Sequence, residues 1–161
     1  MLFRSRRQLE RLGVSVRTGS AVTAIAPGRL QVGDESIEAG TILWAAGVSA
    51  SRLGATIGAP LDAAGRVVVS PDLSVPGHPD VYVVGDLAAF AGPDGRQMPG
   101  VIQVALQQAA CAAANILRSL KGESRATFSY HDLGSMATIG RNAAVCDLGW
   151  IRLTGRPAWL A

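Results

Sequence analysis

The chain has 161 residues, a formal net charge of +3, and 48% hydrophobic residues against 17% charged ones. This composition can bury a core, so it excludes a disordered protein and a polybasic nucleic-acid binder. Two cysteines are too few for a disulfide scaffold and form no metal-binding motif, and no run approaches the roughly 18 apolar residues of a transmembrane helix.

The first 47 residues predict one helix and several short strands. Leucines at helical spacing, with Gly13 after them, indicate a helix over residues 2–12. Apolar and polar residues then alternate in short runs separated by turns, which is typical of half-buried strands. These strands are expected at residues 14–17, 22–26, 30–32 and 36–38. The uninterrupted apolar run at 41–44 predicts a strand buried on both faces, which leads into residues 45–47.

The rest of the chain predicts loops, strands and one long helix. Glycine and proline indicate a loop over residues 48–66. The run at 81–84 is the clearest buried strand, and Gly85 and Asp86 close it. An alanine-rich helix is expected over residues 101–120. Further short strands are expected at residues 67–69, 128–130, 137–140 and 143–148.

Asp86 is a candidate binding residue because it lies at the carboxyl end of a predicted strand. In open α/β sheets ligands bind at this edge, and Gly85 lets a ligand approach the backbone. A carboxylate at such a position can accept hydrogen bonds from a sugar-type hydroxyl. An aspartate after a strand and a glycine also commonly caps the next turn, and spacing alone leaves both roles open.

The start of the long helix is a second candidate. It follows Pro99 and Gly100, so its first amides are expected to be free for an anionic or electron-rich group. Gln103 and Gln107 are four residues apart and therefore share one face of the helix. The alternative is a plain buried alanine-rich helix with two exposed glutamines.

Small residues at 45–47 are a third candidate. Ala45, Ala46 and Gly47 allow a cofactor to lie near main-chain amides, and they equally suit a tight turn between a strand and a loop. His78 and His131 have no partner motif for catalysis. Neither a GxGxxG fingerprint nor a phosphate-binding P-loop occurs in the chain.

Three runs, found in this order, resemble one family. They are TILWAAG at 41–47, GRVVVSPDLSVPGHPDVYVVGD at 65–86 and GSMATIGR at 134–141. With them the chain is similar to the C-terminal portion of a type II NADH dehydrogenase, a flavoprotein NADH:quinone oxidoreductase of the two-dinucleotide-binding-domain superfamily. The resemblance implies an α/β fold, as a partial two-dinucleotide-binding-domain flavoprotein. The implied parts are the end of the NADH-binding domain (1–47), the second half of the FAD-binding domain (48–127) and the start of a membrane-docking, quinone-side region (128–161).

The resemblance also implies cofactor-binding residues for FAD. Asp86 matches the aspartate that binds the ribityl chain, and Gly85 lets the flavin approach. Val104 and Ala105 match positions whose backbone faces the isoalloxazine ring. The strand end where the two dinucleotide domains meet is matched by Ala45, Ala46 and Gly47. No metal is implied.

On the quinone side, the resemblance implies that Gln103 and Gln107 are the catalytic pair. The family has an Ala-Gln-x-Ala-x-Gln pattern here, and in this chain Ile102 replaces its first alanine.

The implied function is electron transfer from NADH through FAD to a quinone, without proton pumping. The partners implied are NADH, quinone and a membrane surface, which the family contacts through a region beyond residue 161. The expected location is peripheral, on the cytoplasmic face of a bacterial inner membrane, and a homodimer is compatible with the family. Nucleic acid is not expected as a partner.

Two alternatives stay open from the sequence. One is another FAD- or NAD(P)-dependent oxidoreductase of the same superfamily. The other is a non-catalytic, truncated module, because both GxGxxG fingerprints of the family lie upstream and are absent here. For the same reason the isolated chain is expected to be inactive, to bind neither FAD nor NADH tightly and to expose apolar surface.

Overall fold

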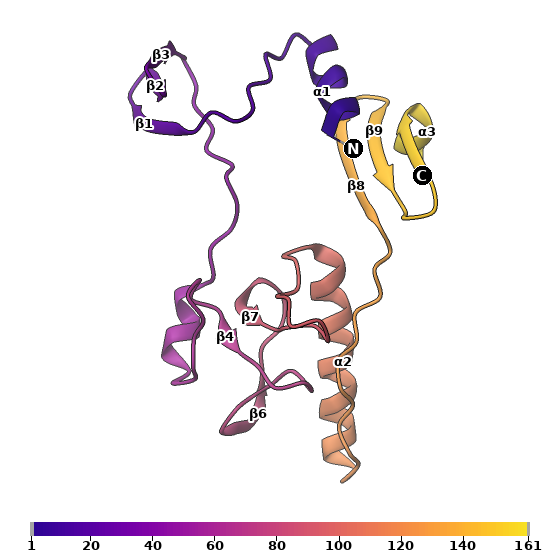
Figure 1. The fold of residues 1–161 in the computed structure, drawn as a ribbon. Helices are drawn as coiled ribbons and strands as arrows, with labels where there is room; N and C mark the ends of the chain where they lie inside the picture. Colours follow the sequence, from indigo (N-terminus) through magenta and orange to yellow (C-terminus); the bar gives the residue numbers. More distant parts are fainter. Residues whose placement is uncertain (1, 161) are drawn as a thin grey trace. The chain divides into compact units, whose positions relative to one another are not determined.

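The structure, a computed structural model, describes residues 2–160 and only the backbone of residues 2–4. It divides into two compact units (Figure 1). One unit consists of residues 1–46 and 133–161, and the other consists of Gly47–Asp132. The three functional parts that the resemblance implies, with limits at 47/48 and 127/128, stay a prediction.

In the first unit, helix α1 (Leu2–Arg11) packs against a C-terminal hairpin. Gly13 ends the helix with a positive φ of 83°, as its place after the leucines predicts. The hairpin consists of β8 (Ser135–Gly140) and β9 (Ala143–Asp147). A Cβ atom at Gly140 would lie 3.1 Å from Leu12 Cδ1, so the absence of a side chain there lets helix and hairpin meet.

Two antiparallel meanders complete this unit. The first joins β1 (Val22–Ala26), β2 (Arg29–Val32) and β3 (Glu35–Glu38), as the alternating pattern predicts. The second adds β10 (Arg152–Gly155) to β9, and a short helix α3 (Arg156–Leu160) packs on β9. Ala144, Cys146 and Ala158 form the buried contact between them. Neither β10 nor α3 was expected from the sequence.

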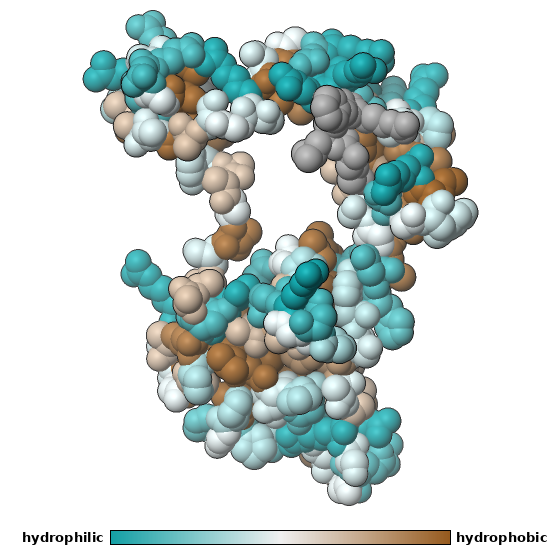
Figure 2. Space-filling model, viewed as in Figure 1, coloured by the Kyte–Doolittle hydropathy of each residue, from teal (hydrophilic) through white to brown (hydrophobic). Residues whose placement is uncertain are grey.

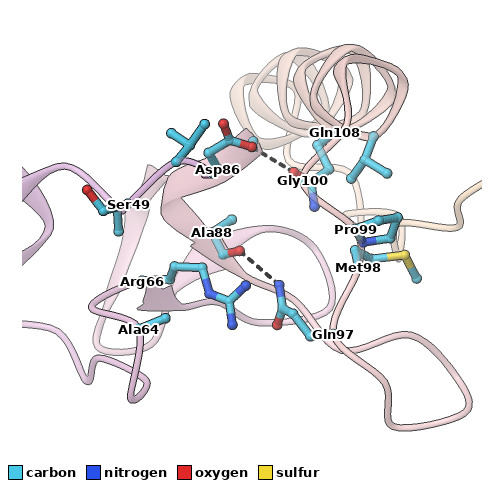
Figure 3. Close-up of a pocket in the computed structure, with 15 residues that line it drawn as sticks. Ser49, Ala64, Arg66, Asp86, Ala88, Gln97, Met98, Pro99, Gly100 and Gln108 are labelled. Carbon is cyan, nitrogen blue, oxygen red and sulfur yellow. Dashed lines mark hydrogen bonds between the residues drawn. The ribbon is translucent and has the colours of Figure 1, made fainter. Parts of the chain in front are cut away.

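In the second unit, short strands and turns pack against one face of the long helix α2 (Ile102–Leu120). A parallel pair joins β4 (Val67–Val68) to β7 (Ala88–Ala89), and an antiparallel pair joins β5 (Ser74–Val75) to β6 (His78–Tyr82). The 3-10 turn η1 (Arg52–Thr56) precedes β4, and a second one, η2 (Gly85–Leu87), lies between β6 and β7. The first turns of α2 form one wall of a cavity (Figure 3).

The core of this unit has two apolar clusters. Val67, Val75, Val83 and Ala88 form the first. In the second, Phe128 meets the edge of Phe90 with ring centroids 5.2 Å apart, a favourable aromatic geometry. Leu73 and Ala112 are buried beside these rings, so α2 is held to the strands by apolar contacts.

Four predicted strands are wrong in detail. Residues 14–17, 41–44 and 128–130 are irregular, and at 81–84 only Val81 and Tyr82 belong to a strand, the end of β6. Leu43 is 86% exposed and Trp44 is 66% exposed. A strand buried on both faces needs neighbours in its sheet, and no described strand pairs with residues 41–44. The apolar run at 41–44 therefore predicted a buried strand, but no neighbouring strand in the described residues covers it.

Hydrophobic side chains lie on the surface of both units (Figure 2). Helix α2 contributes several of them along its exposed face, namely Ile102, Leu106, Ile116, Leu117 and Leu120. None of the helices in residues 2–160 combines the length and the hydropathy that a membrane span requires.

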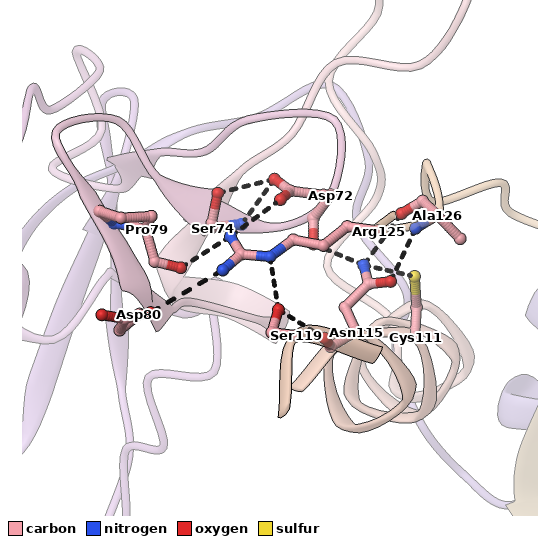
Figure 4. Close-up of polar contacts among 9 residues, drawn as sticks. All are labelled: Asp72, Ser74, Pro79, Asp80, Cys111, Asn115, Ser119, Arg125 and Ala126. Atoms are coloured by element: carbon pink, nitrogen blue, oxygen red, sulfur yellow. Dashed lines mark hydrogen bonds and ion pairs between the residues drawn. The ribbon is translucent and has the colours of Figure 1, made fainter. Parts of the chain in front are cut away.

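The side-chain amide of Asn115 connects three segments of the second unit (Figure 4). The residue is 0% exposed. Its Nδ2 donates to the Asp72 carbonyl at 3.0 Å and to the Ala126 carbonyl at 2.9 Å, while its Oδ1 accepts from the Ala126 amide at 2.8 Å. Every polar atom of this buried amide is therefore hydrogen-bonded, as burial requires.

Arg125 extends this network to the β5–β6 hairpin. Its Nη1 donates to Asp72 Oδ2 at 3.3 Å and to the Pro79 carbonyl at 2.8 Å, and its Nε donates to Ser119 Oγ at 2.7 Å. The guanidinium also lies 5.4 Å from the centroid of the Tyr82 ring. One cation thus ties the end of α2 to the hairpin.

We predict that Asn115→Asp destabilises the second unit by about 3 kcal/mol, because it replaces a buried amide donor with an oxygen that faces two carbonyls. Urea unfolding of the chain measures this loss. Asn142→Asp is the matched control: Asn142 is exposed in a turn with φ 60°, which aspartate also tolerates, so its effect is expected to stay within about 0.5 kcal/mol. Equal stability of the two variants would contradict the role of the buried amide.

We predict that stability also falls in acid through Asp72. Burial raises the pKa of this carboxyl, but hydrogen bonds from Ser74 and the charge of Arg125 outweigh burial and hold the pKa below its ordinary value. A lowered folded-state pKa stabilises the fold above the unfolded pKa of about 3.9, and this contribution is lost as the pH falls through the folded value. Urea unfolding of Asp72→Asn should show a smaller loss below about pH 4. Asp80→Asn, which changes a 96% exposed side chain near the same arginine, should keep the original slope.

Candidate functional site

A cavity of about 470 Å³ lies within the second unit (Figure 3). Its walls come from the loop at 47–50, the turn that carries Arg66, η2 with the start of β7, the segment 97–100, and α2. Several of these segments contribute glycines or alanines, so much of the wall is backbone. Such a surface can bring main-chain amides close to a ligand.

Gly85 and Asp86 form the acidic side of this cavity. Gly85 has a φ of 68°, a conformation that favours glycine, and a Cβ atom on it would lie 3.3 Å from the Cβ of Ala105. A Cβ atom at Gly100 would lie 3.1 Å from Asp86 Oδ1. Glycine at these two positions therefore lets η2, the carboxylate and the segment before α2 lie against one another.

Gln108 fixes Gly85 from the helix and was missed by the sequence analysis. It is 1% exposed, and its Oε1 accepts a hydrogen bond from the Gly85 amide at 2.7 Å. The signal is present in the sequence, because Gln108 lies on one helical face with Val104, Ala112 and Asn115, all buried. A polar residue on an apolar helical stripe indicates a specific partner.

Gln103 and Gln107 lie beside the segment that follows α2 rather than in the cavity wall. The Gln107 amide pairs with the backbone of His131: Nε2 donates to the carbonyl at 2.9 Å, and Oε1 accepts from the amide at 3.0 Å. Gln103 Oε1 accepts from Tyr130 Oη at 3.5 Å. Burial, together with Asp132, raises the pKa of Tyr130. Both glutamines therefore hold residues 130 and 131 against the helix.

Arg66 forms the basic side of the cavity, which the sequence analysis also missed. Its Nη2 lies 2.6 Å from Asp62 Oδ2, and its Nε donates to the same oxygen at 2.7 Å. The hydrogen bond from Arg66 holds the pKa of Asp62 below its ordinary value. Gln97 lies near Arg66 (Figure 3) and donates to the Ala88 carbonyl at 3.2 Å.

The structure brings together four of the nine predicted site residues as cavity lining: Gly47, Gly85, Asp86 and Val104. Ala105 lies directly behind Gly85. Ala45 and Ala46 belong to the first unit. Whether any of the nine residues binds a cofactor stays a prediction. Within residues 2–160 no group of three or more His, Cys, Asp or Glu side chains is placed to hold a metal ion.

The chemistry of this cavity suits binding more than bond cleavage. The exposed carboxylate can accept hydrogen bonds from the hydroxyls of a polyol chain, and the glycine-lined backbone lets a flat ring approach. A Cβ atom at Gly85 would press against Ala105, and one at Gly100 would press against Asp86 Oδ1, so both glycines keep the wall beside the carboxylate free of side chains. Val104, in the first turn of α2, also lines the cavity.

Known proteins with similar sequences are oxidoreductases. The chain is 43% identical to the type II NADH:quinone oxidoreductase Ndh of Mycobacterium tuberculosis, over 98% of this chain and 35% of that protein. It is 35% identical to the type II NADH:quinone oxidoreductase of Staphylococcus haemolyticus, over 78% of this chain and 31% of that protein. The chain thus spans about a third of the length of these curated relatives.

Solved structures show the same fold. The NDH2 structure from Plasmodium falciparum in complex with NADH matches 98% of this chain and 49% of its own, with a TM-score of 0.79 and 15% identity. An FAD-dependent pyridine nucleotide-disulphide oxidoreductase from Desulfovibrio vulgaris matches 88% of this chain and 36% of its own, with a TM-score of 0.69 and 21% identity. The expected α/β fold is therefore confirmed.

The family model for pyridine nucleotide-disulphide oxidoreductases matches residues 4–109, which include α1, the first meander, η2 and the start of α2. This match and the sequence relatives agree with the three runs that resemble type II NADH dehydrogenases. The chain therefore belongs to the pyridine nucleotide-disulphide oxidoreductase family, and the relatives named above are type II NADH:quinone oxidoreductases.

Proposed function

We propose that this chain supplies the flavin- and quinone-side residues of an FAD-dependent NADH:quinone oxidoreductase that does not pump protons. The observation that carries the proposal is the cavity in which Gly47, Gly85, Asp86 and Val104 come together. A bound flavin would supply the redox chemistry, by taking a hydride from NADH and passing electrons to quinone. The protein's part is to bind, orient and shield the reacting groups.

Asp86 and its neighbours would hold the flavin. The carboxylate of Asp86 would accept hydrogen bonds from ribityl hydroxyls, and Gly85 would leave room for the ring system. Gln108 Oε1 accepts from the Gly85 amide at 2.7 Å, so it positions the Val84–Gly85 peptide, one residue before Asp86. Val104 and Ala105 would present the first turn of α2 to the ring, where the partial positive charge of a helix N-terminus favours an electron-rich group.

Gln103 and Gln107 would border the quinone. Their hydrogen bonds to Tyr130 and to His131 place the chain after α2 beside the same helical face. A quinone site formed there would have polar amides on one side and the exposed apolar residues Ile102 and Leu106 on the other. This mixture suits a ligand with an apolar body and polar carbonyl oxygens.

A membrane surface is the proposed source of the quinone. The end of the chain supports this proposal, because Trp159 is 44% exposed and Leu160 is 76% exposed on α3. Such side chains suit an interfacial position. The enzyme would lie peripherally on the cytoplasmic face of a bacterial inner membrane, and a homodimer is compatible with this placement.

We predict that Asp86→Ala lowers flavin retention in the complete enzyme about tenfold, because the charged acceptor for ribityl hydroxyls is lost. Flavin absorbance per protein after gel filtration measures this. Asp94→Ala is the matched control, since Asp94 lies in an exposed turn and its side chain is 61% exposed. Unchanged flavin content in Asp86→Ala would remove this residue from the proposed site.

We predict that Gln107→Ala lowers quinone reduction about tenfold while NADH oxidation by an artificial acceptor falls much less. Comparing the two steady-state rates in one preparation measures this. Gln31→Ala is the control, because it removes a similar bond, from Gln31 Nε2 to the Gly33 carbonyl at 3.0 Å, outside the cavity. Equal losses in both reactions would show that Gln107 only holds His131 in place and has no quinone-side role.

A further inference from the structure

We propose that Arg66 is an anion-binding residue of the cavity and that it recognises the phosphoryl group of a flavin nucleotide. This inference rests on the proposed flavin function and adds a residue to it. Arg66 and Asp86 are the two charged side chains among the residues that line the cavity, and they lie apart on its wall (Figure 3). A ligand with hydroxyls in one part and an anion in another fits this arrangement.

Asp62 holds the arginine in a fixed orientation. Asp62 Oδ1 accepts from the amides of Ala64 and Arg66, both at 2.9 Å, and Oδ2 accepts from Arg66 Nε at 2.7 Å. Both side chains of the pair are less than one-third exposed. One carboxylate therefore closes the turn and immobilises the guanidinium, so a ligand would not have to order it.

The ion pair leaves part of the guanidinium available. Nε and Nη2 face Asp62 Oδ2, whereas within residues 2–160 no acceptor pairs with Nη1. An arginine has five N–H donors in a planar fork, and this fork matches the oxygens of a phosphate group. A side chain needed only to close the turn would not have to line the cavity as well.

The neutral neighbours of Arg66 favour the same ligand. Gln97, Gly47, Ser49 and Ala64 line the same cavity and add no charge to its wall. Asp86 is the one carboxylate among the described lining residues, and Asp62 is already paired with Arg66. Riboflavin, which has no phosphate, would contact Asp86 alone, while FMN and FAD would contact both Asp86 and Arg66.

The test is a titration of the chain with riboflavin, FMN and FAD, followed by flavin fluorescence. We expect FMN and FAD to bind about tenfold more tightly than riboflavin, as one charge-assisted contact allows. In Arg66→Gln this preference should vanish with riboflavin binding unchanged, and Arg66→Lys should keep part of it. Asp86→Asn should weaken all three flavins by a similar factor and keep the preference. Circular dichroism checks that each variant is folded.

The outcomes separate the two proposals. If the chain binds all three flavins equally, or Arg66→Gln keeps the preference for phosphorylated flavins, the role of Arg66 is overturned while the flavin function stands. If no flavin binds to the chain, the role of Arg66 is overturned, and the flavin function fails as well if the complete enzyme retains no flavin. Added potassium chloride should reduce the preference for FMN without changing riboflavin binding, because it screens the charge on the phosphate. A preference independent of salt would also overturn the assignment.

Discussion

The fully buried amide of Asn115 is the interaction on which the second unit depends. A buried amide without partners would cost several kcal/mol, so its three hydrogen bonds require that α2, the turn at Asp72 and the irregular segment at Ala126 keep one arrangement. The β5–β6 hairpin begins two residues after Asp72, and η2 follows the hairpin directly. The position of Asp86 is therefore a consequence of how Asn115 fixes the hairpin to the helix.

Gln108, two turns earlier on the same helical face, likewise uses a buried side-chain amide to bind backbone outside the helix. Asn115 binds the backbone before the hairpin, and Gln108 binds the backbone after it, at the Gly85 amide. Between the two amides, Ala112 allows the apolar cluster around Phe90 and Phe128 to pack closely. The helix thus holds both ends of the hairpin by polar contacts and its middle by apolar ones. This explains why a cavity wall built largely of glycine and alanine can keep a defined shape.

Elements with a complete local signal could be predicted from the sequence. Helix α2 has a long alanine-rich run that ends at glycine, and the first meander has alternating strands joined by turns. Residues 41–44 and 128–130 have the composition of strands, but their state depends on partners that composition does not contain. Within the site, Gly85 and Asp86 were recognisable as a pair adjacent in sequence. Gln108 and Arg66 were missed because their roles arise from Gly85, 23 residues away from Gln108, and from a cavity assembled from distant segments.

Gln107 shows why a residue's chemistry and its structural role have to be separated in this fold. Its side-chain amide donates to and accepts from one peptide group of His131, so it acts as an additional backbone-like pair between α2 and the next segment. In the proposed enzyme, a quinone oxygen would compete with that peptide for the same Nε2 donor. Binding would then have to release residue 131 from the helix or use the second N–H of the amide. The second route keeps the His131 pair intact, since an NH₂ group has two donors and, among the described residues, one of them has an acceptor. The fold therefore allows one glutamine to position the chain and to face a ligand at the same time.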